Sequence, residues 1–130
     1  DRDGDRDAVV AMGRCSAGIR RATRRGSVGN ADVADTGRSL PETMGAHFAV
    51  GDLDLDGDLD VFVTNMDLQN EIWLYHAGSF FDSGLRLGES SEMSGRPTLG
   101  DLDGDGDLDV VVGRFRGGAE IWFNAVLRGD

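Results

Sequence analysis

Two nine-residue segments of this chain place an aspartate at every second position. Residues 52–60 and residues 101–109 share the pattern Asp-x-Asp-x-Asp-Gly-Asp-Leu-Asp. A hard cation such as Ca²⁺ takes about 6–8 oxygen ligands, and a short acidic loop can supply several of them from one stretch of backbone. The glycine at position six permits the sharp turn that such a loop needs. The pattern therefore predicts two metal sites.

Each loop position has an expected role in this chemistry. The carboxylates at positions one, three and five should converge, position seven should offer its backbone carbonyl, and the carboxylate at position nine should close the shell. The predicted ligands are thus Asp52, Asp54, Asp56, Asp58 and Asp60 in one loop, and Asp101, Asp103, Asp105, Asp107 and Asp109 in the other. A third copy, with its first aspartate missing, supplies Asp1, Asp3, Asp5 and Asp7. We expect the chain to begin inside that loop.

The charge of the chain is concentrated in these segments. The formal net charge is -11, and the three segments hold 14 of the 24 acidic residues. An acidic surface turn without metal is the alternative, because Asp and Gly also satisfy turn geometry. Five carboxylates in nine residues repel one another, however, and that repulsion opposes a compact turn without a cation. The acidity therefore favours a bound cation.

The remaining composition bounds the class of protein. An acidic chain disfavours nucleic acid as a partner, since phosphate binding needs a basic face. The single cysteine, Cys15, allows no internal disulfide. The chain has no apolar run of the length needed to insert in a membrane. His47 and His76 have no ligand-spaced His or Cys neighbour, so a zinc or catalytic role is not favoured.

The loops belong to a longer repeat, because residues 51–61 recur at 100–110. Glu71-Ile72-Trp73-Leu74 matches Glu120-Ile121-Trp122-Phe123 at the same offset. Recurrence of the tryptophan in one register favours packing between repeats over a sugar-stacking platform. A repeat unit of this length suits one blade of a β-propeller. All three copies place an isoleucine at the same distance beyond the last loop aspartate: Ile19, Ile72 and Ile121.

The repeat predicts an all-β chain. We expect strands near 47–50, 60–63, 71–75 and 80–87, which make one four-stranded blade. The chain is then a β-propeller fragment of roughly two and a half four-stranded blades. Its parts are a degenerate, truncated repeat at 1–43, a repeat with a complete loop at 44–93 and a truncated repeat with a complete loop at 94–130. Propellers close with about 4–8 blades, so missing sequence or partner chains must supply the remainder.

The loops and their flanks resemble the FG-GAP and VCBS-type repeats of integrin-α-like β-propellers. The resemblance rests on the acidic loop with Phe48-Ala-Val-Gly-Asp before it and Val110-Val-Val-Gly after it, and it covers most of residues 44–124. The family implies a calcium-stabilised propeller, usually of seven blades, in extracellular, secreted or cell-surface proteins that bind proteins or glycans. It also implies that the ten aspartates of the two complete loops are ligands. The Gly-Ala-Pro signature of integrin blades is replaced by Gly113-Arg-Phe.

Other calcium folds fit the flanks less well. An EF-hand loop needs a ligand at position twelve and flanking helices, but Val63 and Val112 occupy that position. Thrombospondin-type arrays need cysteines, and RTX rolls repeat every nine residues. We expect a non-enzymatic module that binds or adheres to an unknown protein or glycan. The alternative is an accessory or catalytic propeller of a secreted carbohydrate-active enzyme.

Overall fold

The computed structural model describes residues 8–11, 17–24, 31–39, 45–66, 68–89 and 94–124. Every regular element in these residues is a β-strand, which confirms the predicted all-β class. The chain divides into two compact units, residues 1–44 and residues 45–130. Among the described residues there is no helix long and apolar enough to cross a membrane.

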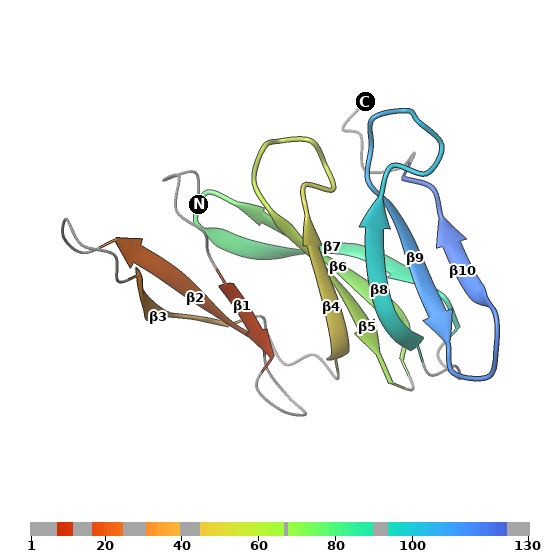
Figure 1. Cartoon of the computed structure of the whole chain (residues 1–130), viewed down its shortest axis with the longest axis horizontal. Helices are drawn as coiled ribbons and strands as arrows, with labels where there is room; N and C mark the ends of the chain where they lie inside the picture. Colours follow the sequence, from red (N-terminus) through yellow and green to blue (C-terminus); the bar gives the residue numbers. More distant parts are fainter. Residues whose placement is uncertain are drawn as a thin grey trace. The chain divides into compact units, whose positions relative to one another are not determined.

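The first unit contains an antiparallel sheet of three strands (Figure 1). Its strands lie in the order β1 (Ala8–Ala11), β2 (Ala17–Arg24) and β3 (Ala31–Ser39). Ile19, the isoleucine that recurs in every repeat, lies in β2 opposite Val9 of β1. The first copy of the repeat therefore forms β-structure after its acidic segment.

The second unit begins with an antiparallel sheet of four strands. They are β4 (Gly45–Gly51), β5 (Asp60–Asn65), β6 (Asn70–His76) and β7 (Ser79–Leu87), and each pairs with the next along the chain. All six residues of β5 are buried, as the apolar run Val61-Phe62-Val63 leads one to expect of an inner strand. The four predicted strands are thus confirmed.

The second unit continues with a three-stranded antiparallel sheet. Its strands are β8 (Ser94–Gly100), β9 (Asp109–Arg114) and β10 (Ala119–Trp122), in the order β8-β9-β10. In the register of the sequence repeat, β8 has the same bounds as β4, and β9 has the same bounds as β5. The two sheets are therefore built from one repeated pattern, as expected of a propeller fragment.

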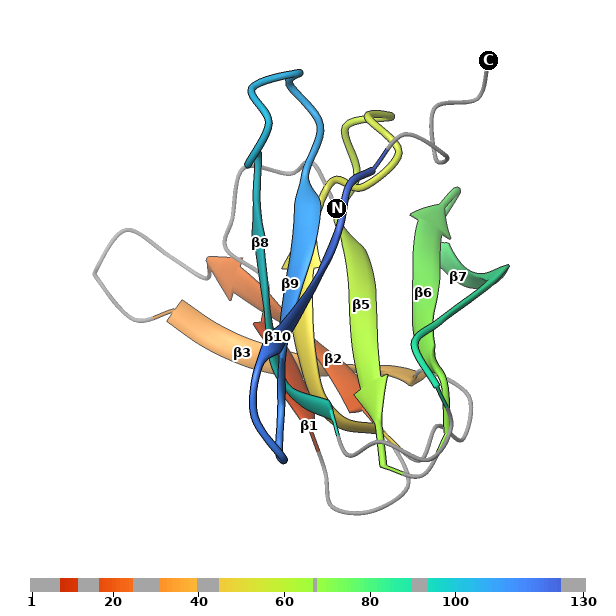
Figure 2. The same cartoon turned by 90° about the vertical axis from the view of Figure 1, so that its right-hand side faces the viewer.

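Both complete acidic loops join the first two strands of their sheets. Gly51 pairs with Asp60 at the base of one loop, and Gly100 pairs with Asp109 at the base of the other. The two loops lie at the same end of the unit, as Figures 1 and 2 both show. The strand pairing thus brings the two ends of each loop together.

The core of the second unit lies between its two sheets. Phe62 of β5 faces Trp122 of β10, with 6.3 Å between the ring centroids. This contact confirms the predicted packing of Trp122 between repeats. Leu53 belongs to an acidic loop but is only 1% exposed, and it packs in the buried cluster with Phe62, Ile72, Val110 and Val112. Full burial of such a side chain stabilises the fold by about 1.5–3 kcal/mol.

Gly51 lies where the two sheets approach each other closely. A Cβ atom at Gly51 would lie 2.7 Å from Leu108 Cδ1 and 2.8 Å from Leu99 Cδ1. At Gly100, the equivalent position in the next sheet, no described atom would lie within 4 Å of an added Cβ. The glycine at residue 51 therefore serves the packing between sheets.

We predict that Gly51→Ala lowers the free energy of unfolding by about 1–3 kcal/mol, because Leu99 and Leu108 must shift. The matched variant Gly100→Ala should change it by less than about 0.5 kcal/mol. Urea unfolding at one fixed calcium concentration measures both values. An equal loss in the two variants would contradict this account of the interface.

Candidate metal sites in the acidic loops

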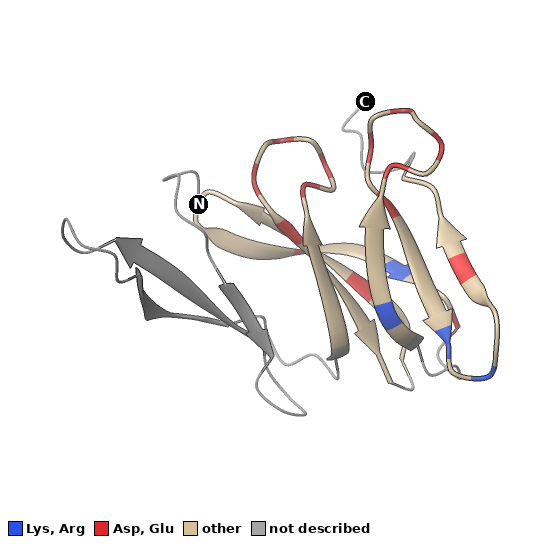
Figure 3. Ribbon diagram, viewed as in Figure 1, with Lys and Arg blue, Asp and Glu red and all other residues tan. Residues whose placement is uncertain are grey.

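In each complete loop, the aspartates at positions one, three and nine converge. Their ligand oxygens lie within 4.8 Å of one another in two trios: Asp52, Asp54 and Asp60, and Asp101, Asp103 and Asp109. Oxygens that share one Ca²⁺ at about 2.3–2.6 Å lie at most about 5 Å apart. Figure 3 shows how the acidic residues cluster in these two loops. Each trio can therefore offer three oxygens to a single cation.

Equivalent hydrogen bonds from backbone N–H groups to aspartate carboxylates shape both loops. The carboxylate at position one accepts a bond from the N–H of the glycine at position six, at 2.9 Å in one loop and 3.0 Å in the other. The carboxylates at positions three and five each accept a bond from the N–H two residues ahead, at 2.8 to 3.2 Å. Gly57 and Gly106 have φ angles of 90° and 95°, which glycine adopts without steric cost. The glycine at position six is thus required by the turn.

The aspartate at position nine is a buried junction in the loop at 52–60. Asp60 is 0% exposed. Its Oδ2 accepts a hydrogen bond from Leu53 N–H at 2.8 Å, and its Oδ1 accepts one from Tyr75 N–H at 2.9 Å. One carboxylate therefore ties the start of the loop to the third strand of the same sheet.

The next repeat contains an equivalent junction. Asp109 is also 0% exposed. Its Oδ2 accepts a bond from Leu102 N–H at 2.8 Å, and its Oδ1 accepts one from Asn124 N–H at 2.8 Å. Because both repeats share this arrangement, the aspartate at position nine shapes the fold as well as offering oxygens to a cation.

Burial sets the electrostatics of the loop at 52–60. Burial raises the pKa of Asp60 to about 6, with the Tyr75 and Leu53 N–H groups opposing the rise and the Asp54 and Asp56 carboxylates adding to it. Burial is also the main cause that raises the pKa of Asp54. Removal from water disfavours the charged form of a carboxylate, and a nearby cation favours it. A cation bound beside Asp54 and Asp60 would therefore oppose the effect of burial on their pKa values.

At Asp109, the end of the other loop, backbone hydrogen bonds outweigh burial in their effect on the pKa. The N–H groups of Asn124 and Leu102 hold the pKa of Asp109 below its ordinary value, and burial opposes them less strongly. Burial raises the pKa of Asp103. At Asp109, the two backbone donors thus favour the ionised carboxylate without help from a metal.

Asp52 gives a separate indication that a cation fits. Its Oδ1 atom is buried and accepts no hydrogen bond from the described residues, while its Oδ2 accepts the bond from Gly57 N–H. A buried oxygen without a partner is destabilising, and a cation would supply the missing partner. Each trio consists of carboxylates alone, which suits a hard cation such as Ca²⁺ and not a soft transition metal.

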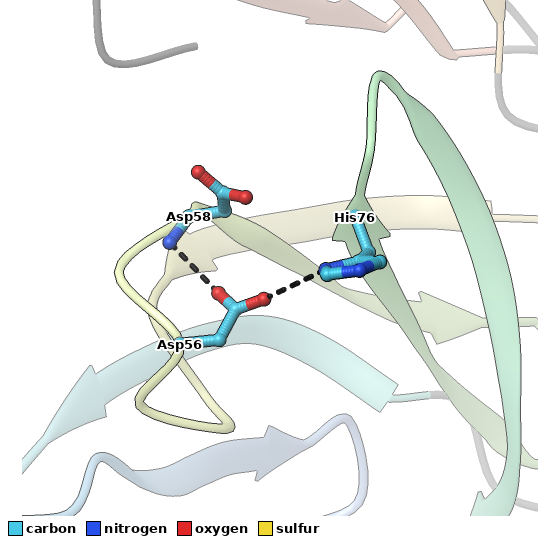
Figure 4. A group of neighbouring side chains, drawn as sticks. All are labelled: Asp56, Asp58 and His76. Atoms are coloured by element: carbon cyan, nitrogen blue, oxygen red, sulfur yellow. Dashed lines mark hydrogen bonds and ion pairs between the residues drawn. The ribbon is translucent and has the colours of Figure 1, made fainter.

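The predicted ligands at positions five and seven lie elsewhere in the loop at 52–60. Asp56 and Asp58 group with His76, the last residue of β6, and not with the Asp52 trio (Figure 4). Asp56 Oδ2 lies 3.3 Å from His76 Nδ1. The Asp58 N–H bond to its other oxygen is the main cause that holds the pKa of Asp56 below its ordinary value. His76 could not be recognised from sequence spacing, because its neighbours in the structure are carboxylates of the loop at 52–60 and not a spaced His or Cys.

The predicted ligands at positions five and seven of the other loop also lie outside its trio. Asp105 is exposed and Asp107 is buried, and neither belongs to the trio formed by Asp101, Asp103 and Asp109. Metal binding by the residues at positions five and seven therefore stays a prediction. Asp1, Asp3, Asp5 and Asp7 lie outside the described residues, so a site there also stays a prediction.

Comparison with known proteins identifies one repeat. Residues 52–112 match the family model of the FG-GAP-like repeat. The match extends from the first aspartate of one complete loop, through the other complete loop, into β9. No curated protein and no solved structure gave a significant match. The predicted resemblance to FG-GAP-type repeats is confirmed over these residues.

We predict that Asp109→Asn destabilises the metal-free protein. The amide keeps one oxygen acceptor, so either Leu102 N–H or Asn124 N–H loses its partner, at a cost of about 1–3 kcal/mol. Asp105→Asn is the matched control, since Asp105 is exposed and the amide oxygen can still accept from Asp107 N–H. Urea unfolding in excess chelator gives both values, and equal midpoints for Asp109→Asn and the wild type would refute the junction.

Proposed function

From the FG-GAP-like repeat at residues 52–112, we propose that this chain is part of a calcium-binding β-propeller that binds a protein or glycan, with calcium in a structural role. The convergence of three carboxylates in each of two equivalent loops carries the proposal. The match to the repeat supports a propeller module, and the oxygen-only donor set supports calcium.

The proposed ligand set begins with the two converging trios. Asp52, Asp54 and Asp60 would hold one ion, and Asp101, Asp103 and Asp109 would hold the other. Asp56, Asp58, Asp105 and Asp107 belong to the set by their loop positions. A bound Ca²⁺ would neutralise the carboxylates and complete their coordination. Magnesium should compete poorly, because it demands a smaller octahedral shell.

The position of the loops supports a structural role for calcium. Strand pairing joins the two ends of each loop: Gly51 pairs with Asp60, and Gly100 pairs with Asp109. In the absence of a cation, the clustered carboxylates repel one another at that junction. A ligand that binds only the folded state stabilises it by about 2.7 kcal/mol at a hundredfold excess over its Kd. Two filled loops would then supply a large share of a stability that is commonly about 5–15 kcal/mol.

An exposed sheet face supports the presence of further blades. Ile72 and Leu74 of the second sheet pack in the core against the third sheet. Their equivalents in the next repeat, Ile121 and Phe123, are 52% and 57% exposed. Because the repeat places Ile121 and Phe123 where Ile72 and Leu74 pack, this face of the β8-β9-β10 sheet is the one on which another blade would pack. The other blades of the propeller would come from other parts of the parent protein or from partner chains.

The calcium concentration needed to fill such sites indicates the location of the protein. Extracellular calcium modules often have dissociation constants of about 10⁻⁴–10⁻³ M, which only a calcium-rich environment fills. We therefore propose an extracellular, secreted or cell-surface location and a non-enzymatic binding or adhesion role. Fractionation of cells that make the parent protein tests the location, and recovery in the cytosol alone would exclude it.

We predict saturable binding of Ca²⁺ at the two complete loops. Calorimetric titration should show this uptake in the wild type and its loss in the double variant Asp54→Ala, Asp103→Ala, because one member of each trio is removed. The double variant Ser83→Ala, Thr98→Ala, which lies outside both loops, should titrate like the wild type. Equal heats from the wild type and the Asp54, Asp103 variant would disprove the sites.

We also predict that chelation lowers the melting temperature by at least about 5 °C, since two bound ions stabilise only the folded state. Asp56→Ala or Asp105→Ala should reproduce part of that loss in the presence of calcium. Arg116→Ala, an exposed change in the turn between β9 and β10, should not. Differential scanning calorimetry with and without chelator makes the comparison, and identical melting temperatures would rule out a structural role for calcium.

A further inference from the structure

Asn124 lies just beyond the end of β10 and contacts both acidic loops. Its backbone N–H donates to Oδ1 of Asp109, the last residue of its own loop, at 2.8 Å. Its side-chain Nδ2 donates to the backbone carbonyl of Leu53, the second residue of the other loop, at 2.7 Å. The carbonyl can only accept, so the amide nitrogen must be the atom that faces it. One residue thus joins two acidic loops that are far apart in the sequence.

The contact completes a hydrogen-bonded path between the two trios. The same Leu53 that accepts from Asn124 donates its N–H to Asp60 Oδ2 at 2.8 Å. Asp60 and Asp109, at the two ends of the path, are both 0% exposed. Leu53 is held in the core at 1% exposure, so its backbone has little freedom to adjust independently. A continuous chain of hydrogen bonds therefore runs from Asp109 through Asn124 and Leu53 to Asp60.

Tyr75 occupies the position of Asn124 in the preceding repeat and makes the equivalent backbone bond to Asp60. Its ring packs on Phe80, with 4.9 Å between ring centroids. The backbone bond is thus common to both repeats, and the side-chain amide of Asn124 adds the bond to the Leu53 carbonyl.

We propose that Asn124 is a positioning residue that couples the two loops, so that a cation in one favours a cation in the other. The inference rests on the proposed function, that both loops bind Ca²⁺. An ion at Asp109 orders the backbone of Asn124, whose amide holds the Leu53 carbonyl and so keeps Leu53 N–H on Asp60. The second ion then has less backbone left to order, which is positive cooperativity. For a path that depends on one side-chain bond, the expected coupling is about fivefold, the low end of the usual range.

Asn124→Ala tests the coupling, because it removes the amide and keeps the backbone N–H. The coupling factor is the constant for binding two ions divided by the product of the two single-loop binding constants. Asp54→Ala leaves only the loop at 101–109 to be measured, and Asp103→Ala leaves only the loop at 52–60. Calorimetry should give a factor of about five in the wild-type background and about one in the Asn124→Ala background. Any ion held by the incomplete first loop is common to all these variants.

Asn65→Ala is the matched control. Asn65 also donates its Nδ2 to a backbone carbonyl at 2.8 Å, that of Gln69, within the connection from β5 to β6. Its loss should lower the melting temperature in chelator and leave the coupling factor near five, so that loss of stability and loss of coupling are separated. Asn124→Leu, of similar size and without a donor, replaces Asn124→Ala if that variant does not fold.

The outcomes separate the two claims. A factor near five that falls to one with Asn124→Ala or Asn124→Leu, but not with Asn65→Ala, supports the inference. Two binding loops with a factor of one in the wild type, or with coupling that survives both Asn124 variants, would overturn it and leave the proposed function intact. Absence of Ca²⁺ binding at either loop would overturn the proposed function, and the inference with it.

Discussion

The buried carboxylates of Asp60 and Asp109 organise the second unit of the chain. Each accepts one hydrogen bond from the N–H of the second residue of its loop and one from an N–H near the end of the third strand of its sheet. A carboxylate that is 0% exposed needs such partners, because burial without them is costly. The loop, the first strand pair and the third strand are therefore fixed around one side chain.

Each loop also brings further carboxylates close to its buried aspartate. Three carboxylates converge in each loop, and a buried oxygen of Asp52 accepts no hydrogen bond from the described part of the chain. Burial raises the pKa of Asp60 to about 6, whereas the backbone donors hold the pKa of Asp109 below its ordinary value. The two repeats thus share a geometry and differ in the balance between burial and backbone donors at the last aspartate of the loop. A cation would satisfy both, and it would act on the same junctions that hold the strands together.

The features that could be predicted from the sequence are those that recur in each repeat. The acidic loops and the strands around them follow from the spacing of Asp, Gly and apolar residues within one repeat, and the packing of Trp122 between repeats follows from the recurrence of tryptophan in the same register. Contacts between distant positions were not accessible in this way. Leu53 reads as a spacer between two aspartates but lies in the core, and His76 approaches Asp56 only because β6 ends beside the loop. The amide of Asn124 is still less visible, since Tyr75 replaces it in the preceding repeat.

Amide hydrogen exchange tests the role of the buried carboxylates most directly. The amides to follow are the four that donate to Asp60 and Asp109, those of Leu53, Tyr75, Leu102 and Asn124. In the calcium-loaded protein they should exchange as slowly as the interior amides of β5 and β9, although Leu53 and Leu102 lie in loops. With Asp109→Asn, protection should fall at Leu102 or Asn124 and persist at Tyr75, whose N–H bond to Asp60 lies within the other repeat. Exchange of Leu53 and Leu102 at the rate of an exposed, unbonded amide would contradict the central role of the buried carboxylates.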